Sequence, residues 1–276
     1  MAQLGRYNTL TVAKEVDFGL YLEDSEYGEI LIPKRYVPEN CKVDDQLEIF
    51  LYLDSEDRPV ATTEKPLVQV GEFAFLDVVS LTPVGAFLNW GLPKDLLLPF
   101  REQKAPPEEG QKLLVYVYYD AESKRIVASE KIDKFLDNVP AEYTPNEEVD
   151  ILIVRKTNLG FNAIINHQHW GLLYQNEVHQ PIAPGQTLKA YIKAIRPDEK
   201  IDLSLYKAGY ARVGDSTLHI LAYLKENNGF MPFNDKSEAE EINWVFGISK
   251  KNFKKALGAL YKNRQIDITP EGVKLT

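Results

Sequence analysis

A segment that recurs three times, about seventy residues apart, constrains the fold of this chain more than any other feature. Each copy opens with an apolar stretch that ends in a turn around one glycine. The stretches are Leu10–Leu22, Ala74–Leu88 and Val149–Ile164, and the turns read Phe18-Gly19-Leu20-Tyr21, Val84-Gly85-Ala86-Phe87 and Leu159-Gly160-Phe161-Asn162. The recurrence indicates that most of the chain is one small module used three times.

Within each copy, apolar residues alternate with polar ones, which predicts β-strands. The third copy shows this best: Leu188–Ile195 alternates along its length, as a half-buried strand does. Pro184-Gly185 precedes this stretch, and an acid-to-base turn at 197–200 separates it from Ile201–Leu205. Such turn residues between two strands predict a β-hairpin that closes a small antiparallel sheet. The same order recurs at 43–62 and 109–129.

Beyond residue 208 the apolar period changes to that of a helix. Leu218, Leu221 and Leu224 form a stripe within Thr217–Asn227, and Asp215-Ser216 is the predicted N-cap. The elements predicted after it are a short strand at Phe230–Phe233, helices at Glu238–Phe246 and after Ser249, and a hairpin from Gln265 to Thr276. This order is that of a winged helix.

Composition excludes several classes of protein. No apolar run approaches the roughly 20 residues of a membrane-spanning helix, and Met1–Leu10 lacks a leader pattern, so we expect a soluble, cytoplasmic protein. The only cysteine, Cys41, excludes an intramolecular disulfide, and its polar loop indicates a structural or incidental thiol. The net charge of −9 is concentrated in residues 1–64, with 6 basic and 14 acidic residues, whereas residues 209–276 have 10 basic and 8 acidic ones.

The repeated motifs resemble the S1 RNA-binding domain, a five-stranded barrel of the OB type. Phe18-Gly19-Leu20-Tyr21 resembles its Phe-Gly-x-Phe turn, and Gly171–Glu177 is similar to its third-strand motif. At the position of the family's RNA-stacking histidine we expect Leu31, Leu97 and Tyr174. Three such modules followed by a winged helix resemble the conserved virulence factor B family of bacteria over essentially the full chain.

This resemblance implies a mainly β fold. We expect OB-type, S1-like barrels at 1–64, 65–138 and 139–208, followed by an α+β winged-helix domain at 209–276. It also implies RNA binding and a role in the regulation of gene expression.

Exposed aromatic rings are the parts that a barrel needs to bind a single strand, because each base stacked on a ring gains about 1–3 kcal/mol. The candidate stacking residues are those that match the turn, those that lie beside turn residues, and the third-strand tyrosine: Phe18, Tyr21, Phe87, Trp90, Trp170 and Tyr174. The alternative is that these rings fill the small cores, as aromatic residues commonly do.

Basic residues supply candidate phosphate contacts. One lies in the closing hairpin of each repeat, at Arg58, Arg125 and Lys200. Others follow Ser249 on the third helix of the tail, at Lys250, Lys251, Lys254 and Lys255, in a stretch that has no acidic residue before Gln265. In a winged helix this face is the recognition surface; the alternative is an ordinary solvated helix face.

The sequence has no Gly-x-x-x-x-Gly-Lys-Ser/Thr loop, no His-Glu-x-x-His helix and no Gly-x-Ser-x-Gly elbow, so we expect a non-catalytic protein without a cofactor. The one cluster that suggests a metal, His167, His169 and His179 with Glu177, is better explained as surface histidines, and we expect no metal. The predicted function is the binding of single-stranded RNA, with post-transcriptional regulation of gene expression. The ribosome or duplex nucleic acid are further candidate partners of the winged helix. The alternatives are a protein-interaction or ribosome-associated scaffold and a winged-helix DNA-binding regulator.

Overall fold

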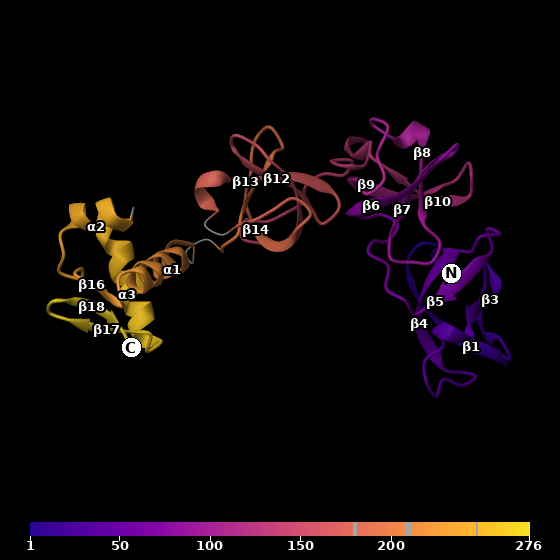
Figure 1. Cartoon of the computed structure of the whole chain (residues 1–276), viewed down its shortest axis with the longest axis horizontal. Coiled ribbons are helices and arrows are strands. Elements are labelled where there is room, and N and C mark those ends of the chain that lie inside the picture. The colour runs from indigo at the N-terminus through magenta and orange to yellow at the C-terminus, as the bar shows by residue number, and fades with distance from the viewer. Residues whose placement is uncertain (179–180, 208–210, 247) are drawn as a thin grey trace.

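The computed structural model describes residues 1–178, 181–207, 211–246 and 248–276. It confirms the predicted fold class: three closed five-stranded barrels are followed by a unit of three helices and a small sheet. Figure 1 shows the winged-helix unit at one end of the long axis, the third barrel next to it, and the first two barrels beside each other at the other end.

The three barrels share one topology. The strands of the first are β1 (Tyr7–Val16), β2 (Gly19–Asp24), β3 (Gly28–Pro33), β4 (Gln46–Leu53) and β5 (Pro59–Thr62). Those of the second are β6 (Phe73–Thr82), β7 (Gly85–Asn89), β8 (Leu96–Pro99), β9 (Lys112–Asp120) and β10 (Arg125–Ser129). Those of the third are β11 (Glu148–Lys156), β12 (Gly160–Ile165), β13 (His169–Tyr174), β14 (Thr187–Ile195) and β15 (Ile201–Ser204). In each barrel the third and fifth strands pair in parallel and close the sheet.

The first strand of each barrel pairs with two neighbours. Strand β1, for example, pairs with β4 through Tyr7–Thr11 and with β2 through Thr11–Val16. A bulge lies in its second half, and the equivalent strands carry one too, between Val12 and Lys14, Val78 and Ser80, and Ile153 and Arg155. Bulges bend a strand and increase its twist, which lets one strand take part in both sides of a closed barrel.

The turn glycines are required by close packing. A Cβ added to any of them would meet a carbonyl oxygen of the third strand, at 2.1 Å for Gly19 and Ile32, 2.3 Å for Gly85 and Leu98, and 1.9 Å for Gly160 and Leu173. No other residue fits there without moving the backbone. The recurring glycine therefore reflects a recurring contact between the second and third strands.

The first two barrels share an apolar interface. Phe50 and Tyr52 of β4 point out of their own barrel and join the core cluster of the second, where the Phe50 ring meets Trp90 edge-on at 5.7 Å. The alternation of β4 predicts a half-buried strand, but Ile49–Leu53 is buried on both faces because the second barrel covers its outer side. Two ion pairs also connect the two barrels. The Asp57 carboxylate accepts a hydrogen bond from Lys94 Nζ at 3.1 Å and forms an ion pair with Arg125.

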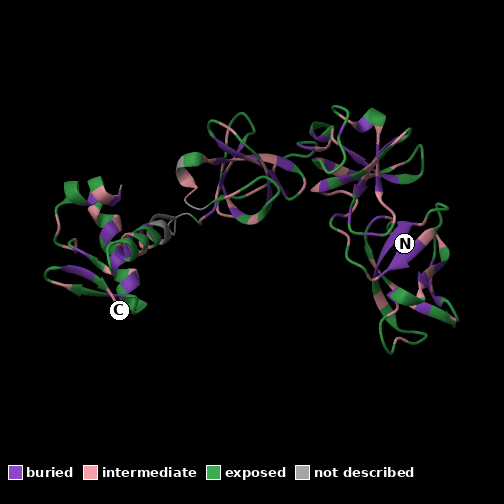
Figure 2. Cartoon of the chain, in the orientation of Figure 1, coloured by how far each residue is buried: buried purple, intermediate pink, exposed green. Residues whose placement is uncertain are grey.

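The second and third barrels share a smaller cluster. It contains Phe73, Leu152 and Ile164, together with Ile132 from the short 3₁₀ helix η3 (Ile132–Phe135). Trp170 packs at its edge. Figure 2 shows buried segments within each barrel and at these junctions.

The C-terminal unit has the predicted winged-helix order: α1 (Ala211–Glu226), β16 (Phe230–Met231), α2 (Ala239–Phe246), α3 (Lys250–Lys262), β17 (Ile266–Thr269) and β18 (Gly272–Leu275). The predicted start of α1 is wrong, because the helix already includes Asp215 and Ser216. The Ser249 cap of α3 is confirmed: its Oγ accepts from the Asn252 N–H at 3.3 Å. Phe253, Ala256 and Leu257 are buried in the core.

Candidate nucleic-acid interface

The turn between β1 and β2 exposes an aromatic pair. Phe18 is 58% exposed, and its ring meets the half-buried ring of Tyr21 edge-on, with centroids 6.3 Å apart. Lys14 Nζ lies 4.6 Å from the Tyr21 centroid and 2.6 Å from a Glu29 oxygen. Neither ring belongs to the barrel core, which is filled by apolar residues of alternating positions such as Leu22 and Ile32. The pair with its lysine is a surface on which a base can stack.

The second barrel has two candidate aromatic residues near its glycine turn, Phe87 and Phe100. Phe87 is half-buried on β7 and pairs with Leu97 as Tyr21 pairs with Leu31. Phe100 is 60% exposed and follows Pro99 at the end of β8, where the first barrel has Lys34 after Pro33. Sequence reasoning missed Phe100 because it searched the glycine turn. Aligning Pro33 with Pro99 is the signal that identifies it.

In the third barrel the candidate is Tyr174. Its hydroxyl accepts from Arg196 Nη2 at 2.9 Å and donates to Asp202 Oδ1 at 3.3 Å, and Lys193 Nζ lies 5.7 Å from its ring. Arg196 also forms an ion pair with Asp202, in which Nη2 lies 2.7 Å from Oδ1. Tyr174 is thus a half-buried ring fixed by charged neighbours at the end of β13.

The predicted alignment of Tyr174 with Leu31 and Leu97 is wrong by two residues. Gly160 pairs with Tyr174 as Gly19 pairs with Pro33 and Gly85 with Pro99. The residue equivalent to Leu31 is Leu172, which pairs with Asn162. Because side chains on a strand repeat every two residues, Tyr174 still projects from the same face as Leu172.

The two tryptophans among the candidate stacking residues lie at junctions between barrels. Trp90 is 3% exposed, packs against Phe50, and donates from Nε1 to the Lys94 carbonyl at 2.7 Å. Its ring faces protein on both sides of the first junction, so it is not available to a base. Trp170 is half-buried against the cluster at the second junction, and its backbone N–H donates to Asp137 Oδ1 at 3.1 Å.

The basic residues of the closing hairpins are all engaged by carboxylates. Arg58 pairs with Asp54 at 2.7 Å and with Glu56 at 2.9 Å, within its own hairpin. Lys200 pairs with Asp198 at 2.8 Å, and this hydrogen bond lowers the pKa of the Asp198 carboxyl.

Arg125 reaches into the neighbouring barrel. Its hydrogen bond to Asp57 lowers the pKa of that carboxyl below its usual value. Any phosphate that binds Arg58, Arg125 or Lys200 must compete with these contacts. The structure thus shows these residues chiefly as hairpin and junction contacts.

Helix α3 presents an uncompensated positive face. Lys251, Lys254 and Lys255 are exposed and form no ion pair with any residue that the structure describes, while Lys250 donates to the Lys236 carbonyl at 3.3 Å. Gly258 lies among these lysines, and a Cβ placed on it would have nothing within 4 Å. The face that carries Phe253 and Leu257 is buried, so the lysine face is the one open to a partner.

His167 and His169, the two members of the predicted cluster that the structure describes, form no joint site. His169 is buried between the Tyr143 hydroxyl and the Val139 carbonyl, each at 2.8 Å, and His167 Nδ1 accepts from the Phe73 N–H. His179 lies outside the described residues. Within the described ranges, no group of three His, Cys, Asp or Glu side chains is placed to hold a metal. Among the same residues, no helix is long and apolar enough to cross a membrane.

Comparison with known families matches three parts of the chain. Residues 4–64 and 70–130 match the S1 domain, and residues 219–275 match the CvfB-like winged helix domain. The third barrel lies outside these ranges but has the same strand order as the first.

Several curated proteins are similar over most of their length. An uncharacterized protein, YitL, of Bacillus subtilis is 28% identical over 270 residues, which is 95% of this chain and 90% of that protein. Conserved virulence factor B of Staphylococcus aureus is 26% identical over 246 residues, 84% of this chain and 82% of that protein. A crystal structure of a Streptococcus pneumoniae multidomain protein with nucleic acid binding domains is 25% identical, with 99% of this chain and 98% of that chain covered and a TM-score of 0.41.

The fold and the family matches define a protein of tandem S1-type barrels with a C-terminal winged helix. The resemblance inferred from the sequence is confirmed: the chain belongs to the conserved virulence factor B family.

Proposed function

We propose that this protein binds single-stranded RNA without catalysing a reaction. The observation that carries the proposal is the exposed Phe18–Tyr21 pair with Lys14 beside it. An exposed ring loses contact with water when a base stacks on it, and a lysine at its side offers the phosphate a charge. Phe100 and Phe87 in the second barrel and Tyr174 in the third are the corresponding surfaces.

The winged helix supplies the second part of the proposal. Lys251, Lys254 and Lys255 pair with no carboxylate in the described part of the chain, so phosphates can pair with them without breaking a contact seen there. This face of α3 is therefore the main electrostatic anchor, and the barrels hold the bases. A role in post-transcriptional regulation is also part of the proposal, and it rests on the family to which the chain belongs.

A second candidate function is duplex DNA binding through α3, since a winged helix commonly places this helix in the major groove. The specific observation in its favour is that Lys251, Lys254 and Lys255, which form no ion pair with any described residue, gather on one face of α3.

The two functions differ in what they bind best. Fluorescence anisotropy with a single-stranded RNA, a duplex RNA and a duplex DNA of equal length, at two salt concentrations, tests them on the full chain. We expect the single-stranded RNA to bind most tightly and the Phe18→Ala/Tyr21→Ala variant to lose affinity for it. A preference for duplex DNA that survives this double substitution would favour the second candidate.

A further inference from the structure

Trp244 lies in solvent on the winged-helix unit. It is 87% exposed, whereas Ile242 and Phe246, two residues away on either side, are buried in the core. A helix with this spacing turns Trp244 away from the core, so its exposure follows from the register of α2. Tryptophan is the residue most enriched where protein partners bind, because it brings a large apolar face and a polar N–H.

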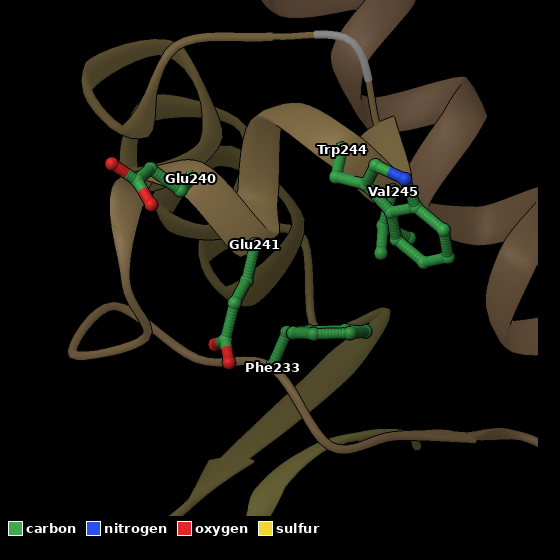
Figure 3. A pocket seen from close by; sticks show the side chains of 5 residues that line it. All are labelled: Phe233, Glu240, Glu241, Trp244 and Val245. Atoms are coloured by element: carbon green, nitrogen blue, oxygen red, sulfur yellow. The ribbon is translucent and has the colours of Figure 1, made fainter.

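A pocket opens beside this ring. Its volume is about 540 Å³, and it is lined by Phe233, Glu240, Glu241, Trp244 and Val245 (Figure 3). The Phe233 ring meets Tyr223 at 6.2 Å and Phe246 at 5.6 Å, both edge-on. These contacts pack Phe233 against the core of the winged-helix unit, so this side of the pocket is already formed in the free protein. We call the five lining residues the Trp244 pocket.

The Trp244 pocket has two uncompensated negative charges. Glu240 and Glu241 precede Trp244 by four and three residues, which places all three on one side of α2. Both carboxylates are exposed, and neither forms an ion pair or side-chain hydrogen bond with a residue that the structure describes. In Figure 3 they lie at one side of the pocket and the indole at the other. Two free carboxylates repel phosphate, which separates this surface from the lysine face of α3.

We infer that the Trp244 pocket is a docking site for an arginine-bearing segment of a protein partner. A guanidinium is planar, so it can stack on the indole while its N–H groups donate to Glu240 or Glu241. An apolar neighbour of that arginine can then cover Phe233 and Val245. The choice of a basic peptide rests on charge complementarity, and it does not depend on the proposed RNA binding.

The test uses the full chain and three synthetic probes: a short peptide of alternating arginine and leucine, the same peptide with glutamate in place of arginine, and a single-stranded RNA. Binding is followed by the anisotropy of a labelled probe, with the tryptophan emission of the chain as a second readout; Trp244→Ala shows how much of the emission change belongs to Trp244 and how much to Trp90 and Trp170. We expect the arginine–leucine peptide to bind and to shift the emission to shorter wavelength. Trp244→Ala and Glu240→Gln/Glu241→Gln should each weaken this binding about tenfold or more, since truncated anchor residues commonly cost that much.

Two controls make the outcome decisive. Both variants should keep the melting temperature of the parent, because the altered side chains are exposed, and both should keep its RNA affinity. Lys251→Gln/Lys254→Gln, on the opposite-charge surface, should leave peptide binding unchanged. The inference is overturned if the parent does not bind the arginine–leucine peptide, if the variants bind it equally well, or if the glutamate peptide binds as tightly. An RNA signal lost in the Trp244→Ala variant would assign the pocket to nucleic acid instead.

Discussion

The backbone N–H of Phe73, in the second barrel, donates a 3.0 Å hydrogen bond to Nδ1 of His167, in the third. The two rings also stack, with planes 11° apart. An imidazole nitrogen accepts a hydrogen bond only when it carries no proton. The junction between the second and third barrels therefore contains a group whose protonation opposes the contact.

This contact predicts a pH dependence. Burial lowers the pKa of His167 below its ordinary value of 6.5, while Glu72 and Asp150 act in the opposite direction. A group whose pKa is lower in the folded state stabilises the fold above its unfolded pKa, and that stabilisation is lost as pH falls through the folded pKa. We expect the melting temperature of the protein to fall as the pH is lowered through the ordinary histidine value of about 6.5 and below it. His167→Gln keeps an acceptor without titrating, so an equally steep fall in this variant would contradict the assignment.

If the Phe18–Tyr21 pair binds bases, removing the two rings should lower the affinity for RNA without lowering the stability of the protein. Phe18→Ala/Tyr21→Ala should cost RNA affinity about 1–3 kcal/mol per base contacted and change the melting temperature little. Phe50→Ala is the matched control, because that ring is fully buried at the first junction and its loss should destabilise the protein by about 3–5 kcal/mol. Thermal melts and anisotropy titrations on the same samples check both. A large stability loss in the Phe18/Tyr21 variant, with affinity kept in the folded fraction, would assign the two rings to the fold.

The lysine face of α3 predicts the salt dependence of binding. Changing Lys250, Lys251, Lys254 and Lys255 to glutamine should weaken binding and flatten the plot of log affinity against log salt, by about 0.7 in slope per lost contact on a single strand. Lys189, which pairs with Asp150, is the control site, and its substitution should change the slope less. An unchanged slope in the α3 variant would place the phosphate contacts on the barrels.

Gly258 predicts a gain in stability together with a loss in binding. A glycine within a helix is less stable than alanine by about 0.8–1.0 kcal/mol, and nothing lies within 4 Å of an added Cβ here. Gly258→Ala should therefore raise the melting temperature. If a phosphate backbone approaches α3 closely between the lysines, the same methyl group should weaken binding. Affinity that stays equal to that of the parent would show that the backbone of α3 is not approached.

The boundary before the winged helix predicts an independent fragment. We propose that residues 1–208 form three barrel domains, at 1–64, 65–138 and 139–208, and that 209–276 fold separately. Deletion of 209–276 should then leave a β-rich fragment with a cooperative melt, because each barrel and the winged helix has a core cluster of its own. Loss of cooperativity in the fragment would mean that the tail completes the third barrel.

The sequence was sufficient to predict the barrels and the winged helix because these depend on local periodicity and turn residues. It was insufficient at Phe50 and Trp90, since alternation reports that one face of a strand is buried and cannot report that a second barrel covers the other. Placing Tyr174 at the position of Leu31 sets Gly171, three residues earlier, at the position of Gly28, and the two glycines differ. Gly28 is the first residue of β3, with φ of 66° and open space around it, whereas a Cβ on Gly171 would lie 2.6 Å from Leu203. Helical periodicity in the tail identifies the apolar residues that face the core. Trp244 does not belong to that apolar face, so periodicity alone does not identify it; the useful signal is an aromatic residue on the polar face of α2.

The contact of Gly19, Gly85 and Gly160 with the carbonyl oxygens of the third strands has a consequence for how the three barrels diverge. The constraint is an interior one, and it leaves the exposed residue before each glycine open to change. Phe18, Val84 and Leu159 occupy one site in three copies and differ in each. Barrels of this one topology can thus present different side chains to a ligand, while the glycine preserves the same contact between the second and third strands.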